Sequence, residues 1–274
     1  MSDSYTSVFP LRRKGEVTEV LIDWICAARL QLRESFGLDF PVLRLHFDGG
    51  GEFSSNLLRA FCRAEGIRQT FTLPASPQQN GIAERRIGMV MDVARTSMIH
   101  AAAPHFLWPF AVPYAAHQIN LQPRVSLPET SPTLRWTGKV GDASAFRVWG
   151  SRAFVRDLSA DKLSSRAVPC LFLGFPPDAP GWHFYHPTSR RVLSSQDVTF
   201  DEEDKVGVWK NITTQQGGKL KRYSFVSSHV TSFGAKWEAI YLIKSVTYVV
   251  AHPLNNHALC RPAICTIGKY KPGC

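Results

Sequence analysis

Residues 42–53, V-L-R-L-H-F-D-G-G-G-E-F, and residues 72–86, T-L-P-A-S-P-Q-Q-N-G-I-A-E-R-R, contain the two acids around which the rest of the chain is organised. Asp48 directly follows an apolar run that predicts a strand. Glu84 opens the most regular helical periodicity of the chain, and 35 residues lie between the two acids. A strand end and a helix that bring two carboxylates to one point suit divalent-metal binding and phosphoryl transfer.

Local patterns on both sides of these acids predict alternating strands and helices. Apolar residues recur with helical spacing over 16–36 and 82–99, and the β-rich runs 5–11 and 68–73 alternate with them. This alternation predicts an α/β layer. From 146 to 200 the period changes to two, with turn residues between short runs, which predicts a small β-barrel.

The positive charge of the chain is concentrated in its last seventy residues. The net charge is +10, but residues 1–204 hold 22 Lys and Arg against 21 Asp and Glu, whereas residues 205–274 hold 10 against 1. Most cations of the first part are Arg, and most of the second are Lys. This change predicts an unrelated basic tail, either disordered or a nonspecific nucleic-acid-binding arm.

Several motifs, in a fixed order, match one known family. They are H-F-D-G-G-G-E-F at 46–53, F-C-x-x-x-G-I at 61–67, the segment 72–86 quoted above and F-L-W-P-F-A-V at 106–112. These motifs closely resemble the integrase core of copia-type LTR retrotransposons, particularly those of plants. The later strand-rich segment, with A-F-R-V-W-G-S-R-A-F-V and S-Q-D-V-T-F-D-E, looks like the SH3-like module that follows this core.

The resemblance implies an RNase H-like fold with three acids that hold two divalent cations, Mg²⁺ or Mn²⁺. In that family the site processes DNA 3′ ends and transfers strands. Mapped onto this sequence, Asp48 is the second acid and Glu84 the third, and both are expected to be catalytic and to bind metal. The metals stabilise the attacking 3′-hydroxyl and the leaving oxygen. Because an Asp and a Glu at this spacing also occur by chance, the surrounding motifs carry the assignment.

The sequence departs from the family at the first acid. In the family that acid lies on the opening strand, five residues before the aromatic position of Tyr5, and this offset falls just before Met1. Asp3 is not expected to replace it. The chain is therefore expected to be an N-terminally truncated fragment with an incomplete active site. Phe47 stands where the family usually has Ser, and is expected either to crowd the metal site or to pack.

The residues beside Glu84 are expected to contact DNA. Gln78, Gln79, Asn80 and Arg85 carry amide and cationic donors suited to phosphate or base contacts. The alternative is a solvated loop and helix face. The implied partners are DNA, as retroelement ends and target, and further copies of the chain.

Together these observations predict an α/β fold, with an RNase H-like mixed sheet flanked by helices, a small SH3-like β-barrel and the basic tail. The predicted divisions are an integrase core without its first strand (1–121), a linker (122–144), the SH3-like module (145–203) and the tail (204–274). The predicted function is DNA integration by descent, through metal-dependent polynucleotidyl transfer, with no activity in this chain. The alternatives are a noncatalytic nucleic-acid-binding fragment and a pseudogene product. A functional protein is expected in the nucleus, and no apolar run is suited to span a membrane.

Overall fold

The computed structural model divides the chain into two units built from interleaved segments. One unit contains Met1–Val90, Ala116–Ala143 and Trp237–Cys274, and the other contains Met91–Ala115 and Ser144–Lys236. The structure describes residues 5–37, 42–47, 51–72, 81–123, 130–156, 165–176, 179–202, 226–227, 230–231, 239–244 and 264–270. Each unit has a five-stranded sheet.

The first unit alternates helices and strands as predicted. It contains β1 (Thr6–Leu11), η1 (Lys14–Glu16), α1 (Val17–Phe36), β2 (Arg44–Phe47), η2 (Gly51–Ser54), α2 (Asn56–Ala64), β3 (Arg68–Phe71), α5 (Pro132–Thr137), β11 (Ala239–Lys244) and β12 (Ile264–Tyr270). Helix α3 (Gly81–His100) begins in this unit, and α4 (Trp108–Leu121) ends in it. The strands and helices predicted around the two acids are confirmed, with ends that differ by at most two residues.

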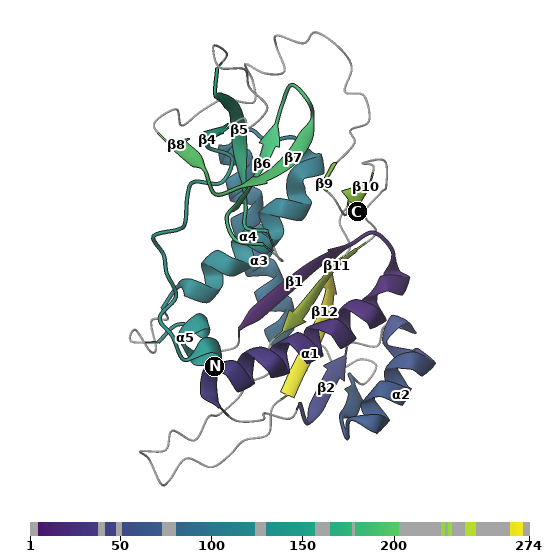
Figure 1. Ribbon diagram of the computed structural model, residues 1–274. Coiled ribbons are helices and arrows are strands. Elements are labelled where there is room, and N and C mark those ends of the chain that lie inside the picture. Colours follow the sequence, from purple (N-terminus) through teal and green to yellow (C-terminus); the bar gives the residue numbers. More distant parts are fainter. Residues whose placement is uncertain are drawn as a thin grey trace. The chain divides into compact units, whose positions relative to one another are not determined.

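The sheet of the first unit is mixed, as predicted, and has the strand order β1-β11-β12-β2-β3 (Figure 1). Strands β1, β11 and β12 pair antiparallel, and β12, β2 and β3 pair parallel. Helix α1 lies across one face of this sheet (Figure 1). The predicted α/β class, with helices beside a mixed sheet, is therefore confirmed.

Two inner strands of this sheet come from the segment predicted to be an unrelated tail. Six residues of β11 pair with β1, and four residues of β12 pair with β2. Composition predicts a tail separate from the core, because Lys residues dominate the average charge of residues 204–274. Strand formation depends instead on short β-rich runs, and β11 and β12 are such runs.

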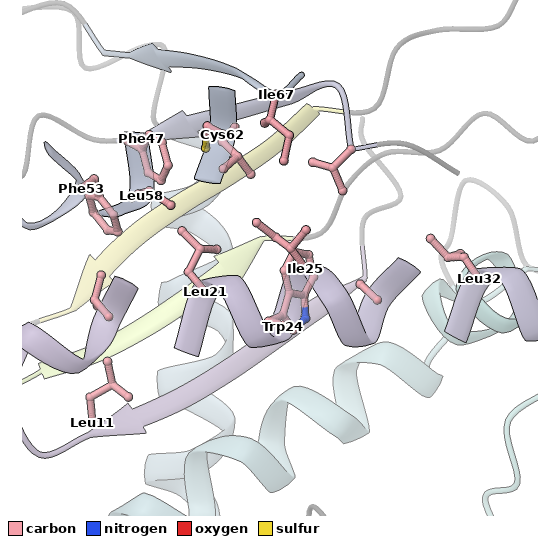
Figure 2. Packing of buried hydrophobic residues seen from close by; sticks show 14 of the residues in the cluster. Leu11, Leu21, Trp24, Ile25, Leu32, Phe47, Phe53, Leu58, Cys62 and Ile67 are labelled. Carbon is pink, nitrogen blue, oxygen red and sulfur yellow. The ribbon is translucent and has the colours of Figure 1, made fainter. Parts of the chain in front are cut away.

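Helix α1 packs its apolar stripe against β2 and α2. Leu21, Ile25 and Leu32 are buried, and Figure 2 shows Leu21 and Ile25 close to the side chains of Phe47 and Cys62. The periodicity of the sequence already predicts this face, since residues three and four apart share one side of a helix. The helix ends where Gly37 adopts a φ of 68° and its N–H donates to the Arg33 carbonyl at 2.8 Å.

The segment predicted as a linker carries one residue of this core. Trp136 on α5 is 4% exposed and stacks on Tyr5 and Trp24, with ring centroids 5.3 Å and 6.3 Å away. Its indole N–H donates to Gln31 Oε1 at 2.8 Å. Ser131 caps α5 by accepting a hydrogen bond from the Leu134 N–H at 3.1 Å. Part of 122–144 therefore belongs to the packed unit.

The second unit contains an antiparallel sheet with the order β7-β6-β5-β4-β8. Its strands are β4 (Arg152–Arg156), β5 (Ala167–Gly174), β6 (Trp182–His186), β7 (Arg191–Ser195) and β8 (Val198–Asp201), and β9 (Val226–Ser227) pairs with β10 (Val230–Thr231). The period-two pattern therefore predicts these strands correctly. The SH3-like strands are as predicted, but among the described residues no pairing joins β7 to β8, so the five strands form an open sheet and no barrel closure is seen.

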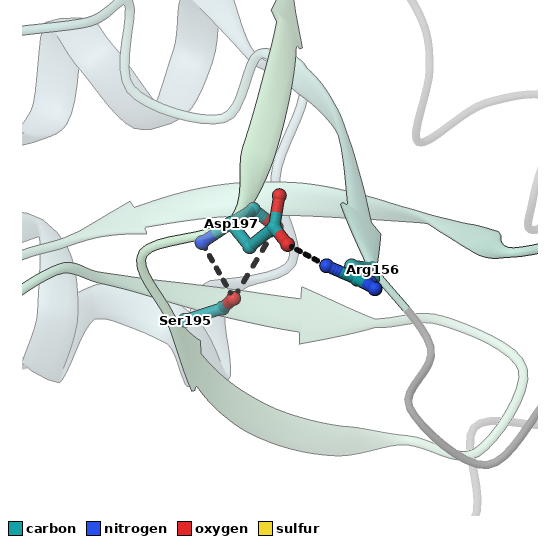
Figure 3. Close-up of polar contacts among 3 residues, drawn as sticks. All are labelled: Arg156, Ser195 and Asp197. Atoms are coloured by element: carbon teal, nitrogen blue, oxygen red, sulfur yellow. Dashed lines mark hydrogen bonds and ion pairs between the residues drawn. The ribbon is translucent and has the colours of Figure 1, made fainter.

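The turn from β7 to β8 is fixed by side-chain hydrogen bonds (Figure 3). The Asp197 N–H donates to Ser195 Oγ at 3.1 Å, and the Ser195 hydroxyl donates to the Asp197 carbonyl at 3.3 Å. Arg156 Nη1 at the end of β4 pairs with Asp197 Oδ2 at 2.9 Å. These contacts link the turn to the end of β4, and β8 itself pairs with β4 through the backbone, where the sequence alone predicts only a turn.

Aromatic residues of η4 (His105–Leu107) and α4 cover the second sheet. Phe106, Phe110 and Tyr114 are four residues apart and so lie on one side of a helical path. Their rings contact Tyr185, His183 and Phe172, with centroids 5.9, 5.9 and 5.3 Å apart. The face of the sheet is therefore packed against the chain's own helix.

None of the described helices combines the length and the apolar character that crossing a membrane requires.

Candidate metal and nucleic-acid site

The end of β2, which leads to Asp48, is held by packing and by Thr72. The Phe47 side chain is fully buried and stacks on Phe53, with ring centroids 4.7 Å apart. Its carbonyl accepts hydrogen bonds from the Thr72 N–H at 2.9 Å and the Thr72 hydroxyl at 3.1 Å. Of the two expectations for Phe47, the structure therefore shows core packing.

The neighbouring residue His46 lies on the opposite face of β2, because side chains alternate along a strand. Its Nδ1 lies 3.0 Å from Thr70 Oγ1, and its Nε2 lies 3.3 Å from Thr72 Oγ1. Burial, and then the charge of Arg44, lower the pKa of His46 below its ordinary value of 6.5. A neutral ring has only one N–H, and the shorter contact favours Nδ1 as the donor.

These threonines also bond the backbone of β2. The Thr70 hydroxyl donates to the Leu45 carbonyl at 3.1 Å, as the Thr72 hydroxyl does to Phe47. The bond from His46 to Thr70, together with the bonds from both threonines to carbonyls of β2, thus holds the carboxyl ends of β2 and β3 in register. Sequence reasoning did not assign a role to either threonine. The sequence pattern that could have indicated this role is T-x-T at residues 70–72, at the end of the strand that pairs with the His46 strand.

Glu84 lies in the first turn of α3 and Arg85 follows it directly, and both side chains are exposed. The next residue, Arg86, is only 6% exposed. Exposure therefore separates the two adjacent arginines, and Arg85 is the one available to a ligand. The positive end of the helix dipole stabilises an acidic side chain such as Glu84 in this turn.

The other predicted site residues, Asp48, Gln78, Gln79 and Asn80, lie outside the described residues. In the part of the chain that the structure describes, no three His, Cys, Asp or Glu side chains are grouped to hold a metal ion. The Glu84 carboxylate is a hard oxygen ligand of the kind that Mg²⁺ prefers. One carboxylate alone does not make a metal site, so the described residues do not test the predicted two-metal centre.

Two kinds of known sequence are similar to this chain. Residues 151–214 match the family described as "Retroviral polymerase SH3-like domain". The chain is 35% identical over 163 residues to the retrovirus-related Pol polyprotein from transposon TNT 1-94 of Nicotiana tabacum, which covers 59% of this chain and 12% of that protein. It is 28% identical over 202 residues to the polyprotein from transposon RE1 of Arabidopsis thaliana, with 72% and 13% covered.

Among solved structures, the chain is similar to the catalytic core domain of BIV integrase. The TM-score is 0.33 and the sequence identity 21%, over 45% of this chain and 70% of that one. The chain spans only 12% or 13% of the length of the Pol polyproteins named above. The sequence matches confirm both the SH3-like module and the resemblance to plant retrotransposon polyproteins.

Proposed function

Since the chain is related to a segment of the retrovirus-related Pol polyproteins of plant transposons and contains a retroviral polymerase SH3-like domain, we propose that it is an integrase-derived segment that binds DNA without transferring strands. The spacing of Asp48 and Glu84 and the motifs around them support descent from an integrase core. Both acids are the proposed ligands of a divalent cation, Mg²⁺ or Mn²⁺.

The proposal that the chain does not transfer strands rests on the composition of the strands beside β2. A two-metal site needs several carboxylates at one point. Strand β2, which precedes Asp48, pairs with β12 on one side and with β3 on the other. Their sequences, I-C-T-I-G-K-Y and R-Q-T-F, contain no Asp or Glu. Neither neighbouring strand therefore adds a third acid to Asp48 and Glu84.

The exposure of Arg85 supports the DNA-binding part. An exposed guanidinium near the start of α3 can pair with a phosphate, and contacts of this kind position DNA without reading its sequence. Gln78, Gln79 and Asn80, which precede the helix, are proposed to add amide contacts. Binding is then expected to weaken as salt rises, because the protein releases counterions from the phosphates.

The test of DNA binding measures the affinity of the purified full chain for a labelled duplex at several salt concentrations. Arg85→Ala is expected to weaken binding of every duplex sequence and to lower the salt slope by about 1. Arg95→Ala is the matched control, because Arg95 is an exposed arginine of α3 that already pairs with Asp92 at 2.8 Å. Equal effects of the two substitutions would exclude a specific role for Arg85.

The test of catalysis incubates the same protein with duplexes that carry transposon-type ends, with Mg²⁺ or Mn²⁺. We expect no joined product. Strand joining that disappears in Asp48→Asn and Glu84→Gln would overturn the noncatalytic part and restore the alternative of an active polynucleotidyl transferase.

A further inference from the structure

We propose that β11 and β12 form a strand pair required for the first sheet, and that the facing backbone edges of β1 and β2 are the docking site for it. This inference concerns the fold of the chain and is independent of DNA binding. The occupant of the site is the pair formed by β11 (Ala239–Lys244) and β12 (Ile264–Tyr270) of the same chain.

Strand β1 leaves one edge open to a further strand, because Asn120 bonds the backbone at its other edge. The Thr6 N–H donates to Asn120 Oδ1 at 2.9 Å, and Asn120 Nδ2 donates to the Thr6 carbonyl at 2.8 Å. Alternate residues of an antiparallel strand present their backbone groups to the same side, so Pro10 faces this outer side with Thr6. Proline has no N–H to offer a neighbour and suits an outer edge.

Among the strands that the structure describes, β11 is the one that pairs with the inner edge of β1. The register runs from Thr6 opposite Lys244 to Leu11 opposite Ala239. Thr6 is 1% exposed and Leu11 5% exposed, so this strand lies in the interior. Without β11, the backbone groups of the inner edge are left without their partners in a region where an unpaired group is costly.

The space between β1 and β2 has the width of two strands. These two strands do not pair with each other, and two strands lie between them in the sheet order. Neighbouring strands are about 4.8 Å apart, so β1 and β2 are separated by about three such spacings. One strand cannot fill this space, whereas an antiparallel pair can, with β11 against β1 and β12 against β2.

Strands β11 and β12 have the composition of inner strands despite the basic segment around them. Their sequences, A-I-Y-L-I-K and I-C-T-I-G-K-Y, are rich in β-branched and aromatic residues. Of the ten Lys and Arg residues after Asp204, only Lys244 and Lys269 fall within them. The apolar runs therefore pair in the sheet, and most of the basic residues lie outside the two strands.

Hydrogen–deuterium exchange of the full chain tests the proposal without DNA. Peptides that cover β11 and β12 are expected to exchange at least about 100-fold more slowly than in the denatured protein, as strands within a cooperative sheet do. Exchange of both peptides at the denatured rate, while β2 stays protected, would overturn the proposal. Because this readout needs no ligand, a failure here is distinct from a failure to bind DNA.

A proline in β12 tests whether the sheet requires the pair. Ile267 lies opposite Ile243 on one side and Phe47 on the other, and a central strand does not accommodate proline. Ile267→Pro is expected to raise the exchange rate of the β2 peptide at least about tenfold and to leave that of β5, in the second unit, unchanged. Ile267→Val is the matched control and keeps the wild-type pattern. Wild-type exchange of β2 in Ile267→Pro would overturn the requirement.

Discussion

Phe47 and His46 are adjacent on β2 but contribute to opposite faces of the sheet. The Phe47 ring belongs to the core cluster that includes residues of α1, α2 and η2, while His46 bonds Thr70 of β3. The alternation of side chains along a strand predicts that His46 and Phe47 lie on opposite faces of the sheet. It does not tell which of the two faces is the core, since that depends on the helices that cover the sheet.

Replacement of the buried phenylalanine tests this assignment. Phe47→Ala is expected to lower the free energy of unfolding by about 3–5 kcal/mol, because it removes a fully buried ring and leaves a cavity. Urea unfolding at equilibrium measures the loss. Phe71→Ala is the control, since Phe71 contacts the same ring at 5.5 Å but is 41% exposed. A loss no larger for Phe47 than for Phe71 would contradict the packing described.

His183 makes the stability of the second unit depend on pH. Burial lowers its pKa from 6.5 to about 4. The unfolded chain therefore binds more protons than the folded chain between these values, and stability falls as the pH drops from 6.5 to about 4. We expect His183→Gln to lose less stability than the wild type over this range, measured by urea unfolding at several pH values. An identical pH dependence in both proteins would show that His183 is not responsible.

At the scale of elements, the contact between α4 and the second sheet includes one polar anchor. The Tyr114 hydroxyl donates to the Arg147 carbonyl at 2.5 Å and accepts from the Arg147 N–H at 3.1 Å. Burial raises the pKa of this phenol to about 12, so it keeps its proton at neutral pH. The anchor fixes the segment before β4 to the helix.

Removal of this hydroxyl is expected to weaken the second unit. Tyr114→Phe leaves the ring contacts with Phe172 in place but removes both hydrogen bonds, so we expect a loss of about 1–2 kcal/mol in the free energy of unfolding. Thermal unfolding followed by circular dichroism measures this loss. Tyr114→Ala, which also removes the ring, is expected to cost more, and equal losses would mean that the ring contributes nothing.

At the scale of the whole molecule, contacts group the chain differently from the divisions predicted by composition. Two of the four boundaries between the units fall inside helices, after Val90 in α3 and after Ala115 in α4, whereas the boundary after Ala143 lies beside the predicted start of the SH3-like module. Sequence patterns place a boundary where composition changes, after residue 121. A helix looks uniform in sequence, so nothing local shows that its two halves pack in different units.

The last seventy residues illustrate the same limit. Their net positive charge and high Lys content distinguish them from residues 1–204. The pairing of β11 and β12 with β1 and β2 involves partners more than two hundred residues apart along the chain. Strand pairing of this kind depends on which backbone edges are open, and composition does not report that.

The sequence by itself determines the elements around Asp48 and Glu84, the helical stripe of α1, the period-two strands of the SH3-like module and the relation to Pol polyproteins. These follow from local periodicity or from motifs in a fixed order, and both can be read along one chain. Only the tertiary structure decides that Phe47 packs in the core, that Arg85 is exposed while Arg86 is buried, and that the tail supplies two strands. Burial and strand pairing decide these features, because both are set by residues distant in sequence.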